Sequence, residues 1–189
     1  MAASVTPLDI PEVLLIAPDR FGDARGFFSE TYNRRWFDEA GLDLDFVQDN
    51  HSYSAGRGTI RGLHYQVEPH AQDKLVRVIR GSVLDVAVDL RRGSPSFGRH
   101  VAEELSADNV RQLFVPKGFA HAFCTLEDHT EVVYKVTGFY APDCDRSLRW
   151  NDPALGIAWP VAADEAILSN KDAEAPLLSE TPDAFTYAD

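Results

Sequence analysis

The strongest constraint on the fold is a series of short segments in which side chains alternate between two faces. Within residues 82–90 every second residue is a leucine or valine, with aspartates and an alanine between them. This period of two is typical of a β-strand. Further candidate strands, rich in β-branched and apolar residues, cover 74–80, 101–105, 112–115, 120–126 and 130–137. Gly81, between residues 74–80 and 82–90, predicts a hairpin turn.

Helical signals are few. Residues 33–40, ended by Gly41, form one candidate helix, and Ser106 is placed to cap a turn. Many closely spaced short strands with few helices indicate an all-β protein, an antiparallel sandwich or barrel. At 189 residues without a repeat or a linker, the chain is expected to form a single domain, 1–189.

The charge balance excludes several function classes. The formal net charge is −12, so the surface repels phosphate backbones and anionic membranes, and we expect no nucleic-acid or membrane partner. No apolar run approaches the roughly 20 residues that span a bilayer, and residues 1–20 carry no basic segment of a secretory signal. The cysteines, Cys124 and Cys144, lack metal-ligand spacing. Two free thiols and a cytoplasmic location are expected.

One window of the chain is basic. Residues 57–80 contain five lysines and arginines against two acidic residues. A cationic cluster on an acidic protein suggests a small anionic ligand, whereas solvated charges at strand edges are the alternative. The cluster comprises Arg57, Arg61, Lys74, Arg77 and Arg80, with His64 and His70.

Two segments of the sequence contain histidine motifs. Gly58-Thr-Ile-Arg-Gly-Leu-His64-Tyr-Gln66 and Pro116-Lys-Gly-Phe-Ala-His121 resemble the paired signature of the cupin jelly roll, an antiparallel β-sandwich or barrel. In metal-binding cupins the first motif has a second histidine where this chain has Gln66, and a glutamate follows. An amide oxygen is a poor ligand for a transition metal, and catalytic metals usually have three protein ligands. We therefore expect no metal here.

Taken together, longer stretches resemble the dTDP-4-dehydrorhamnose 3,5-epimerase family from about residue 7 to residue 178. The matching text is Asp23-Ala-Arg-Gly-Phe-Phe-Ser-Glu30, Gln48-Asp-Asn-His-Ser52, Arg61-Gly-Leu-His-Tyr-Gln66, Lys74-Leu-Val76, Asp85-Val-Ala-Val-Asp-Leu-Arg91, Pro116-Lys-Gly-Phe-Ala-His121, Tyr134-Lys-Val-Thr137, Trp150-Asn-Asp-Pro153 and Ser169-Asn-Lys-Asp172. Nine fragments in the family's order are a specific signal, although each is weak alone.

The resemblance implies a cofactor-free isomerase in dTDP-L-rhamnose or deoxysugar biosynthesis. Its substrate would be a dTDP-linked 4-keto-6-deoxy sugar, inverted at carbons 3 and 5. Both carbons adjoin the C4 ketone, so loss of either proton gives an enolate. Inversion needs a base on one face of the ring, an acid on the other, and stabilisation of the enolate oxygen.

The resemblance also assigns roles to individual residues. It makes His64 the base, with Asp172 as the carboxylate that orients it, and Tyr134 the proton donor on the opposite face. Lys74 would stabilise the enolate oxygen, with help from His121. The substrate-binding positions carried over are Arg25, Glu30, Gln48, Asn50, Arg61, Lys74, His121, Asp145 and Lys171. Without the resemblance, Arg25, Glu30 and Asn50 read equally well as surface or turn residues, and Asp172 as a helix N-cap.

Strand alternation tests part of this assignment. Tyr134 shares a face with Val132 and Val136, and Lys74 with Val76 and Val78, so an inward valine face would carry both polar groups inward. Arg61 and His64 have opposite parity in a regular strand. For both to reach one ligand the strand must bulge, and Gly62 is the predicted site of the bulge.

The sequence also bears on how the chain assembles and on which other functions it could have. The resemblance implies a homodimer, in which a strand at residues 12–17 could add to a neighbour's sheet edge; Arg25 could serve its own cavity or its partner's. A C3-only epimerase, a metal-dependent cupin oxygenase, a non-catalytic sugar-binding module and a sugar-keto isomerase stay open. The nucleotide base and the sugar stereochemistry are not readable from the sequence.

Overall fold

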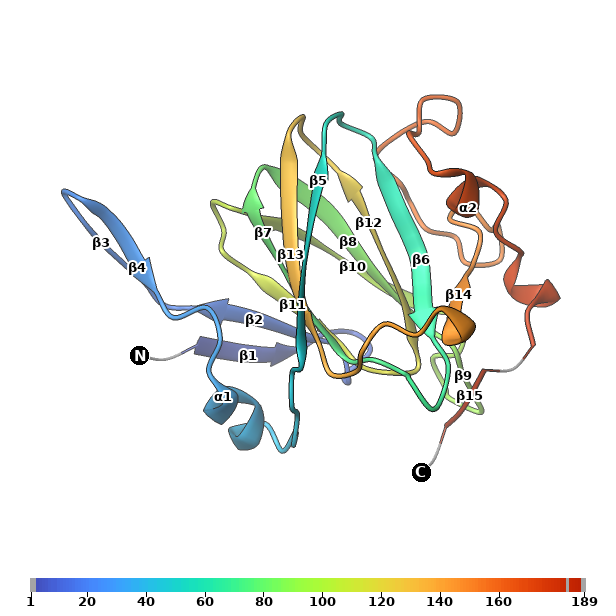
Figure 1. The fold of residues 1–189 in the computed structure, drawn as a ribbon, viewed down its shortest axis with the longest axis horizontal. Helices are drawn as coiled ribbons and strands as arrows, with labels where there is room; N and C mark the ends of the chain where they lie inside the picture. The colour runs from blue at the N-terminus through green and yellow to red at the C-terminus, as the bar shows by residue number, and fades with distance from the viewer. Residues whose placement is uncertain (1–2, 183, 188–189) are drawn as a thin grey trace.

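The computed structural model describes residues 3–182 and 184–187, and most of its regular structure is antiparallel β-sheet. Two large sheets face each other (Figure 1). The six-stranded sheet has the order β1 (Ala3–Pro7), β2 (Leu14–Pro18), β11 (Gln112–Val115), β7 (Lys74–Arg80), β13 (Thr130–Val136) and β5 (Gln48–Ser54). The five-stranded sheet has the order β10 (His100–Ser106), β8 (Ser82–Asp89), β12 (Phe119–Thr125), β6 (Ile60–Gln66) and β14 (Asp145–Ser147). The predicted all-β, cupin-like sandwich is confirmed.

The remaining elements are short. Two minor pairings join β3 (Arg20–Asp23) to β4 (Gly26–Ser29) and β9 (Arg91–Arg92) to β15 (Phe185–Thr186), the latter in parallel. The helical segments are α1 (Arg34–Glu39), α2 (Asn170–Ala173) and the 3-10 turns Pro142–Cys144 and Leu178–Glu180. The first confirms the predicted helix at 33–40, since Asn33 caps its N-terminus. None of the described helices is long and apolar enough to cross a membrane.

Strand β8 shows how the two layers are built. Its inward residues include Val83 and Ala87, which belong to the apolar core between the sheets. Its outward residues, Val86 and Val88, pack in a second cluster with residues of the C-terminal segment. Both faces of the strand are therefore buried, and the aspartates of the predicted alternation point into the interior rather than to solvent.

The predicted hairpin at Gly81 is wrong. Strand β7 pairs with β11 and β13, whereas β8 pairs with β10 and β12, so the two consecutive strands lie in different sheets. Gly81 has a φ of 73°, a conformation that glycine adopts without steric cost. The residue turns the chain from one sheet to the other, which local turn chemistry alone cannot distinguish from a hairpin.

The predicted bulge at Gly62 is confirmed. Opposite β12, His64 pairs with His121 and Arg61 with Phe123, so β6 has one residue more than β12 in this interval. Gly62 has a φ of 128°. A β-carbon there would lie 2.4 Å from that of Ala122, so only glycine fits. The extra residue reverses the alternation and turns both Arg61 and His64 inward.

The expected pairing of residues 12–17 with a neighbour is corrected. Residues Leu14–Pro18 form β2, which lies between β1 and β11 of the same chain. Both sides of β2 are therefore already paired within its own sheet, and β1 is the strand at that sheet's edge.

The β3–β4 hairpin projects away from the body of the protein (Figure 1). All its residues are exposed except Ser29, which is half-buried.

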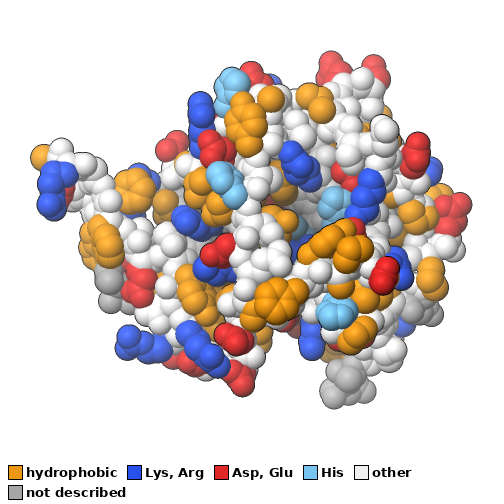
Figure 2. Space-filling model, viewed as in Figure 1, with side chains coloured by type: hydrophobic (Ala, Val, Ile, Leu, Met, Phe, Trp, Pro, Cys, Tyr) orange, Lys and Arg blue, Asp and Glu red, His pale blue; other side chains and the backbone are white. Residues whose placement is uncertain are grey.

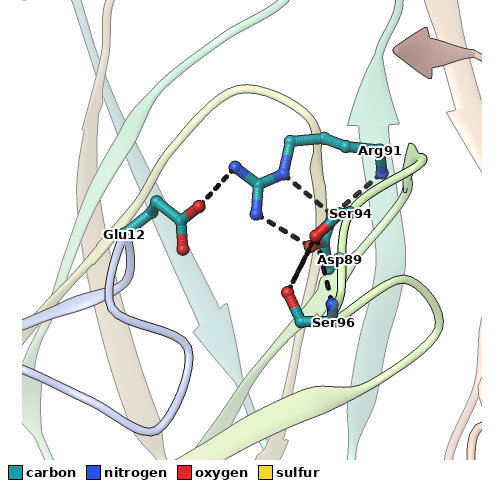
Figure 3. A network of polar contacts seen from close by, with 5 residues as sticks. All are labelled: Glu12, Asp89, Arg91, Ser94 and Ser96. Carbon is teal, nitrogen blue, oxygen red and sulfur yellow. Dashed lines mark hydrogen bonds and ion pairs between the residues drawn. The ribbon is translucent and has the colours of Figure 1, made fainter. Parts of the chain in front are cut away.

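A buried polar network closes one end of the five-stranded sheet (Figure 3). Asp89 is fully buried and accepts hydrogen bonds from the guanidinium of Arg91 and from the hydroxyls of Ser94 and Ser96. Arg91 also pairs with Glu12 at 2.8 Å. Burial alone would raise the pKa of Asp89, but these hydrogen bonds hold it below its ordinary value. The network ties the start of the chain to the end of β8.

Candidate active site

A cavity of about 520 Å³ opens between the two large sheets. In the space-filling view the molecule is hollowed near the middle of the face shown, with basic and histidine side chains at the hollow (Figure 2). The predicted site residues that line the cavity are Gln48, Asn50, Arg61, His64, Lys74, His121, Tyr134, Asp145, Lys171 and Asp172. Of the predicted set, only Arg25 and Glu30 lie elsewhere.

His64 and Asp172 form a hydrogen-bonded pair. Nε2 of His64 lies 2.5 Å from Oδ1 of Asp172, whose side chain is 4% exposed. The two residues are distant in sequence, and a bridge between Thr59 and Ile167 brings the segment before α2 beside the start of β6. Ser169, not Asp172, caps α2, so the N-cap interpretation of Asp172 is wrong. Nδ1 is left as the ring nitrogen that can take a proton from a ligand.

The electrostatics of this pair keep the carboxylate ionised. Burial would raise the pKa of Asp172. The hydrogen bond and charge of His64, with hydrogen bonds from Ser169 and the Gly62 backbone, outweigh burial and lower the pKa. An ionised partner at Nε2 fixes the tautomer and the ring orientation of His64.

Tyr134 reaches the cavity from the opposite sheet. It lies on β13 and packs against the core cluster that contains Val76, Val78 and Val132, so the valine-face prediction is confirmed. Burial raises the pKa of its phenol, partly offset by the charge of Arg61. The phenol is therefore protonated at neutral pH, as a proton donor must be.

Lys74 is the buried cation of the cavity. Its side chain is inward on β7, and Nζ donates a hydrogen bond to the backbone carbonyl of His64 at 3.2 Å. Burial lowers the pKa of Lys74 to about 8, while the charges of Asp85 and Asp145 oppose the shift. The ammonium group is still mostly protonated at pH 7, and its low solvation strengthens its attraction for an anionic oxygen.

Asp85 is a site residue that sequence reasoning missed. Nε2 of His121 lies 2.8 Å from Oδ1 of Asp85, which is fully buried. The other carboxylate oxygen has no hydrogen-bond partner among the described residues. The register of the strands is what identifies Asp85, because Asp85 of β8 pairs with Phe123 of β12 on the inward face of these adjacent strands. Without knowing that β8 and β12 are neighbours, Asp85 reads as an outward charge.

The basic window does not form one patch. Arg61 is held by Ser54 and by the backbone carbonyl of Tyr53, at 3.2 and 2.9 Å, and it lines the cavity with Lys74. Arg77 follows Lys74 by an odd number of residues, so strand alternation puts it on the outer face. Arg80 lies near Glu131 at the strand end. The strand-edge interpretation is therefore right for part of the cluster.

Gln66 and the two histidines do not fit a metal site. The amide of Gln66 is fully used by backbone groups of two loops, while His64 and His121 each pair with a carboxylate. Among residues 3–182 and 184–187, no three histidine, cysteine or acidic side chains are grouped to hold a metal ion.

The cavity mouth has a second charge pair and an aromatic ring. Nζ of Lys171 lies 2.5 Å from Oδ2 of Asp145, and the hydroxyl of Tyr140 donates to the same oxygen at 3.3 Å. Tyr140 is 59% exposed, and Gln72 lines the cavity nearby. Neither Tyr140 nor Gln72 was among the predicted site residues, because loop residues carry no periodicity that would place them.

Arg25 and Glu30 lie outside this cavity. Arg25 is in the turn of the β3–β4 hairpin, with its side chain 89% exposed and paired to Asp23. Glu30 follows the hairpin and accepts a hydrogen bond from Asn33. Within one chain, neither residue joins the cavity-lining groups.

Fold and cavity together define a cupin-like β-sandwich protein whose cavity between the sheets is lined by acidic and basic side chains. A family model described as dTDP-4-dehydrorhamnose 3,5-epimerase matches residues 7–180. The chain belongs to this dTDP-4-dehydrorhamnose 3,5-epimerase family.

Individual relatives agree with that assignment. The chain is 57% identical to the dTDP-4-dehydrorhamnose 3,5-epimerase of Pseudomonas aeruginosa over 168 residues, which cover 88% of this chain and 91% of the relative. It is 53% identical to that of Sinorhizobium fredii, over 95% of this chain and 92% of the relative. A solved Legionella pneumophila 3,5-epimerase in complex with dTDP-4-keto-L-rhamnose has a TM-score of 0.94 at 42% identity, with both chains fully covered. A 3'-monoepimerase of Streptomyces bikiniensis is also similar, with a TM-score of 0.86 at 37% identity over 92% of this chain and 87% of that one.

Proposed function

We propose that this chain is a dTDP-4-dehydrorhamnose 3,5-epimerase that uses His64 as base and Tyr134 as acid. The observation that carries the proposal is their placement. His64 lies on β6 of one large sheet and Tyr134 on β13 of the other, and both side chains line one cavity. A sugar ring held between the sheets would present its two faces to a base and to an acid.

The reaction takes place next to the C4 ketone of a dTDP-4-keto-6-deoxy sugar. Nδ1 of His64 removes the proton from C3 or C5, and the electron pair moves to the ketone oxygen as an enolate. Lys74 stabilises that oxygen, with His121 and its partner Asp85 nearby. Tyr134 then delivers a proton to the other face of the same carbon, which inverts it.

The rest of the substrate extends toward the mouth. Arg61 and Lys171 are the cations available to the diphosphate, since guanidinium and ammonium groups bind phosphate oxygens. Gln48, Asn50 and Asp145 supply amide and carboxylate groups for hydroxyl and base hydrogen bonds. Tyr140 offers an exposed aromatic face for the nucleotide base.

Arg25 and Glu30 would act across a homodimer. A projecting two-stranded hairpin is marginally stable alone, and this one exposes Phe21, Phe27 and Phe28 by 50–60%. Packing against a second copy would bury those rings and bring Arg25 toward the partner's cavity.

Both cysteines are free, which supports the cytoplasm as the compartment of the enzyme.

A C3-only epimerase is the second candidate, favoured by the similarity to a 3'-monoepimerase. Incubation with dTDP-4-keto-6-deoxyglucose in deuterium oxide separates the two by NMR. A 3,5-epimerase takes up deuterium at both C3 and C5, and a C3-only enzyme at C3 alone. If neither carbon exchanges, the epimerase proposal is wrong.

A further inference from the structure

We propose that Gln66 is a positioning residue that shapes the cavity mouth for the nucleotide end of the substrate. This inference rests on the proposed function and adds a residue to it. Gln66 ends β6 only two residues after His64 and lines the same cavity, but its amide forms hydrogen bonds with two loops and with neither His64 nor Tyr134. It is 5% exposed.

The amide of Gln66 makes every hydrogen bond it can make with its two N–H groups. Nε2 donates to the backbone carbonyls of His70 and Phe139, at 2.7 and 3.2 Å. Oε1 accepts from the backbone N–H of Ala141 at 2.7 Å. A buried polar group that is fully satisfied holds its neighbours in one arrangement, because breaking any bond leaves a buried group unpaired.

These contacts join two separate connections of the fold. His70 belongs to the connection between β6 and β7, and Phe139 and Ala141 belong to the connection between β13 and β14. The two bonds to the second connection lie on either side of Tyr140. Gln66 therefore fixes the backbone immediately before and after the aromatic residue at the mouth.

Tyr140 is in turn connected to the charged groups of the mouth. Its hydroxyl donates to Oδ2 of Asp145, the oxygen that also pairs with Lys171, and its backbone N–H donates to Gln48 at 3.4 Å. Displacement of the Tyr140 backbone would thus disturb an aromatic face, a carboxylate and a cation together. The proposed base, His64, and the proposed acid, Tyr134, make no hydrogen bond to the Gln66 side chain.

Other side chains of this size cannot replace the amide. Glutamate keeps an acceptor for Ala141 but puts a carboxylate oxygen against two carbonyl oxygens. Methionine has a similar length and makes none of the three bonds. An imidazole has two ring nitrogens for three backbone partners. The position that carries a metal ligand in metal-binding cupins is therefore used here to shape the mouth.

The test measures dTDP affinity by calorimetry, and KM and kcat by product formation, for Gln66→Glu and Gln66→Met. We expect Kd for dTDP and KM to rise about tenfold or more, as expected for the loss of more than one hydrogen bond. The value of kcat and its pH dependence should stay within about twofold, since the base and acid are untouched. Unchanged Kd in both variants, or a loss confined to kcat, would overturn the proposal.

Thr137→Val is the matched control. Thr137 links the same two connections through hydrogen bonds with Asp73, both at 2.9 Å, but it does not line the cavity. This variant should lose thermal stability and keep the wild-type Kd for dTDP. If it weakens dTDP binding as much as the Gln66 variants do, the effect is general loosening and positioning by Gln66 is refuted.

Two further measurements test the proposal, and the first needs no variant. In wild-type protein, the N–H of Ala141 should exchange with solvent more slowly than unpaired loop amides. Rapid exchange would contradict the claim that Gln66 fixes this loop. In a Tyr140→Ala background, Gln66→Glu should cost little additional dTDP affinity, whereas full additivity would contradict action through Tyr140. Because dTDP binding needs no turnover, failure of the epimerase proposal appears separately, as absent deuterium uptake by the wild type.

Discussion

At the scale of single residues, the proposed base, acid and cation lie on three different strands, and each can be removed alone. His64→Ala should lower kcat by about 10²–10⁴-fold, the usual contribution of a general base. Its far-ultraviolet circular dichroism should match the wild type, because His64 is partly exposed and contributes little packing. Deuterium uptake at C3 and C5 measures the loss, and uptake at the wild-type rate would exclude His64 as the base.

Tyr134→Phe should separate exchange from inversion. His64 can still remove a proton and return one to the same face, so deuterium uptake should persist while epimerised product falls by about 10²–10⁴-fold. NMR of the sugar in deuterium oxide measures both quantities in one experiment. Equal loss of exchange and inversion would contradict the assignment of Tyr134 as the acid alone.

Lys74 should limit stability and enable activity. Its pKa is about 8 when folded against 10.5 as a free side chain, so the unfolded chain binds the proton more strongly. Its burial therefore costs stability below pH 8, by about 3 kcal/mol, and the cost disappears as the pH rises toward 10.5. Lys74→Met should be more stable than the wild type in urea at pH 7, with the difference shrinking above pH 8, and nearly inactive. A less stable Lys74→Met protein at pH 7 would contradict this.

The same pKa predicts the alkaline limb of the wild-type rate. Activity should fall as the pH rises through about 8, because neutral Lys74 no longer stabilises the enolate oxygen. Lys74→Arg, which keeps its charge, should show no such limb in the activity it retains. A wild-type profile that is flat to pH 10 would show that the charge of Lys74 is not required.

At the scale of elements, β6 depends on the one residue that reverses its alternation. Gly62→Ala would put a β-carbon 2.6 Å from the His121 carbonyl oxygen, in a backbone conformation that alanine rarely adopts. We expect a loss of several kcal/mol in unfolding free energy and of most activity, since Arg61 and His64 can no longer both face the cavity. Gly156→Ala, which has a positive φ but open space for a β-carbon, is the control. If Gly62→Ala is no more destabilising than that control, the bulge is not essential.

Element by element, the sequence was most informative where alternation and parity apply. The strands at 74–80 and 112–115 and the inward direction of Tyr134 follow from period two, and the bulge at Gly62 follows from the demand that two residues of opposite parity meet one ligand. Local patterns do not contain the pairing of strands. Hence local patterns predict a hairpin at Gly81 that the structure lacks, and they do not reveal Asp85, whose role depends on β8 lying beside β12.

At the scale of the whole molecule, the two predicted residues outside the cavity define a test of assembly. If the chain forms the proposed homodimer, coexpression of Arg25→Ala and His64→Ala chains gives mixed dimers. If Arg25 acts in the partner's cavity, each mixed dimer has one intact site, and random mixing restores about a quarter of the wild-type sites. If Arg25 acts within its own chain, every site carries a defect. Activity no greater than the mean of the two parents would contradict sharing between subunits.

The network around Asp89 has a consequence for how the polypeptide can be handled. The guanidinium of Arg91 binds Glu12, twelve residues into the chain, and also stacks 5.0 Å from the ring centre of Tyr187, close to its end. Glu12 and Tyr187, which are distant in sequence, thus meet at one side chain. A tag attached directly after the C-terminal segment would pull on the ring that stacks on Arg91, so a long spacer is the sensible choice there, and removing Tyr187 would take away one of the contacts that hold the guanidinium beside Glu12.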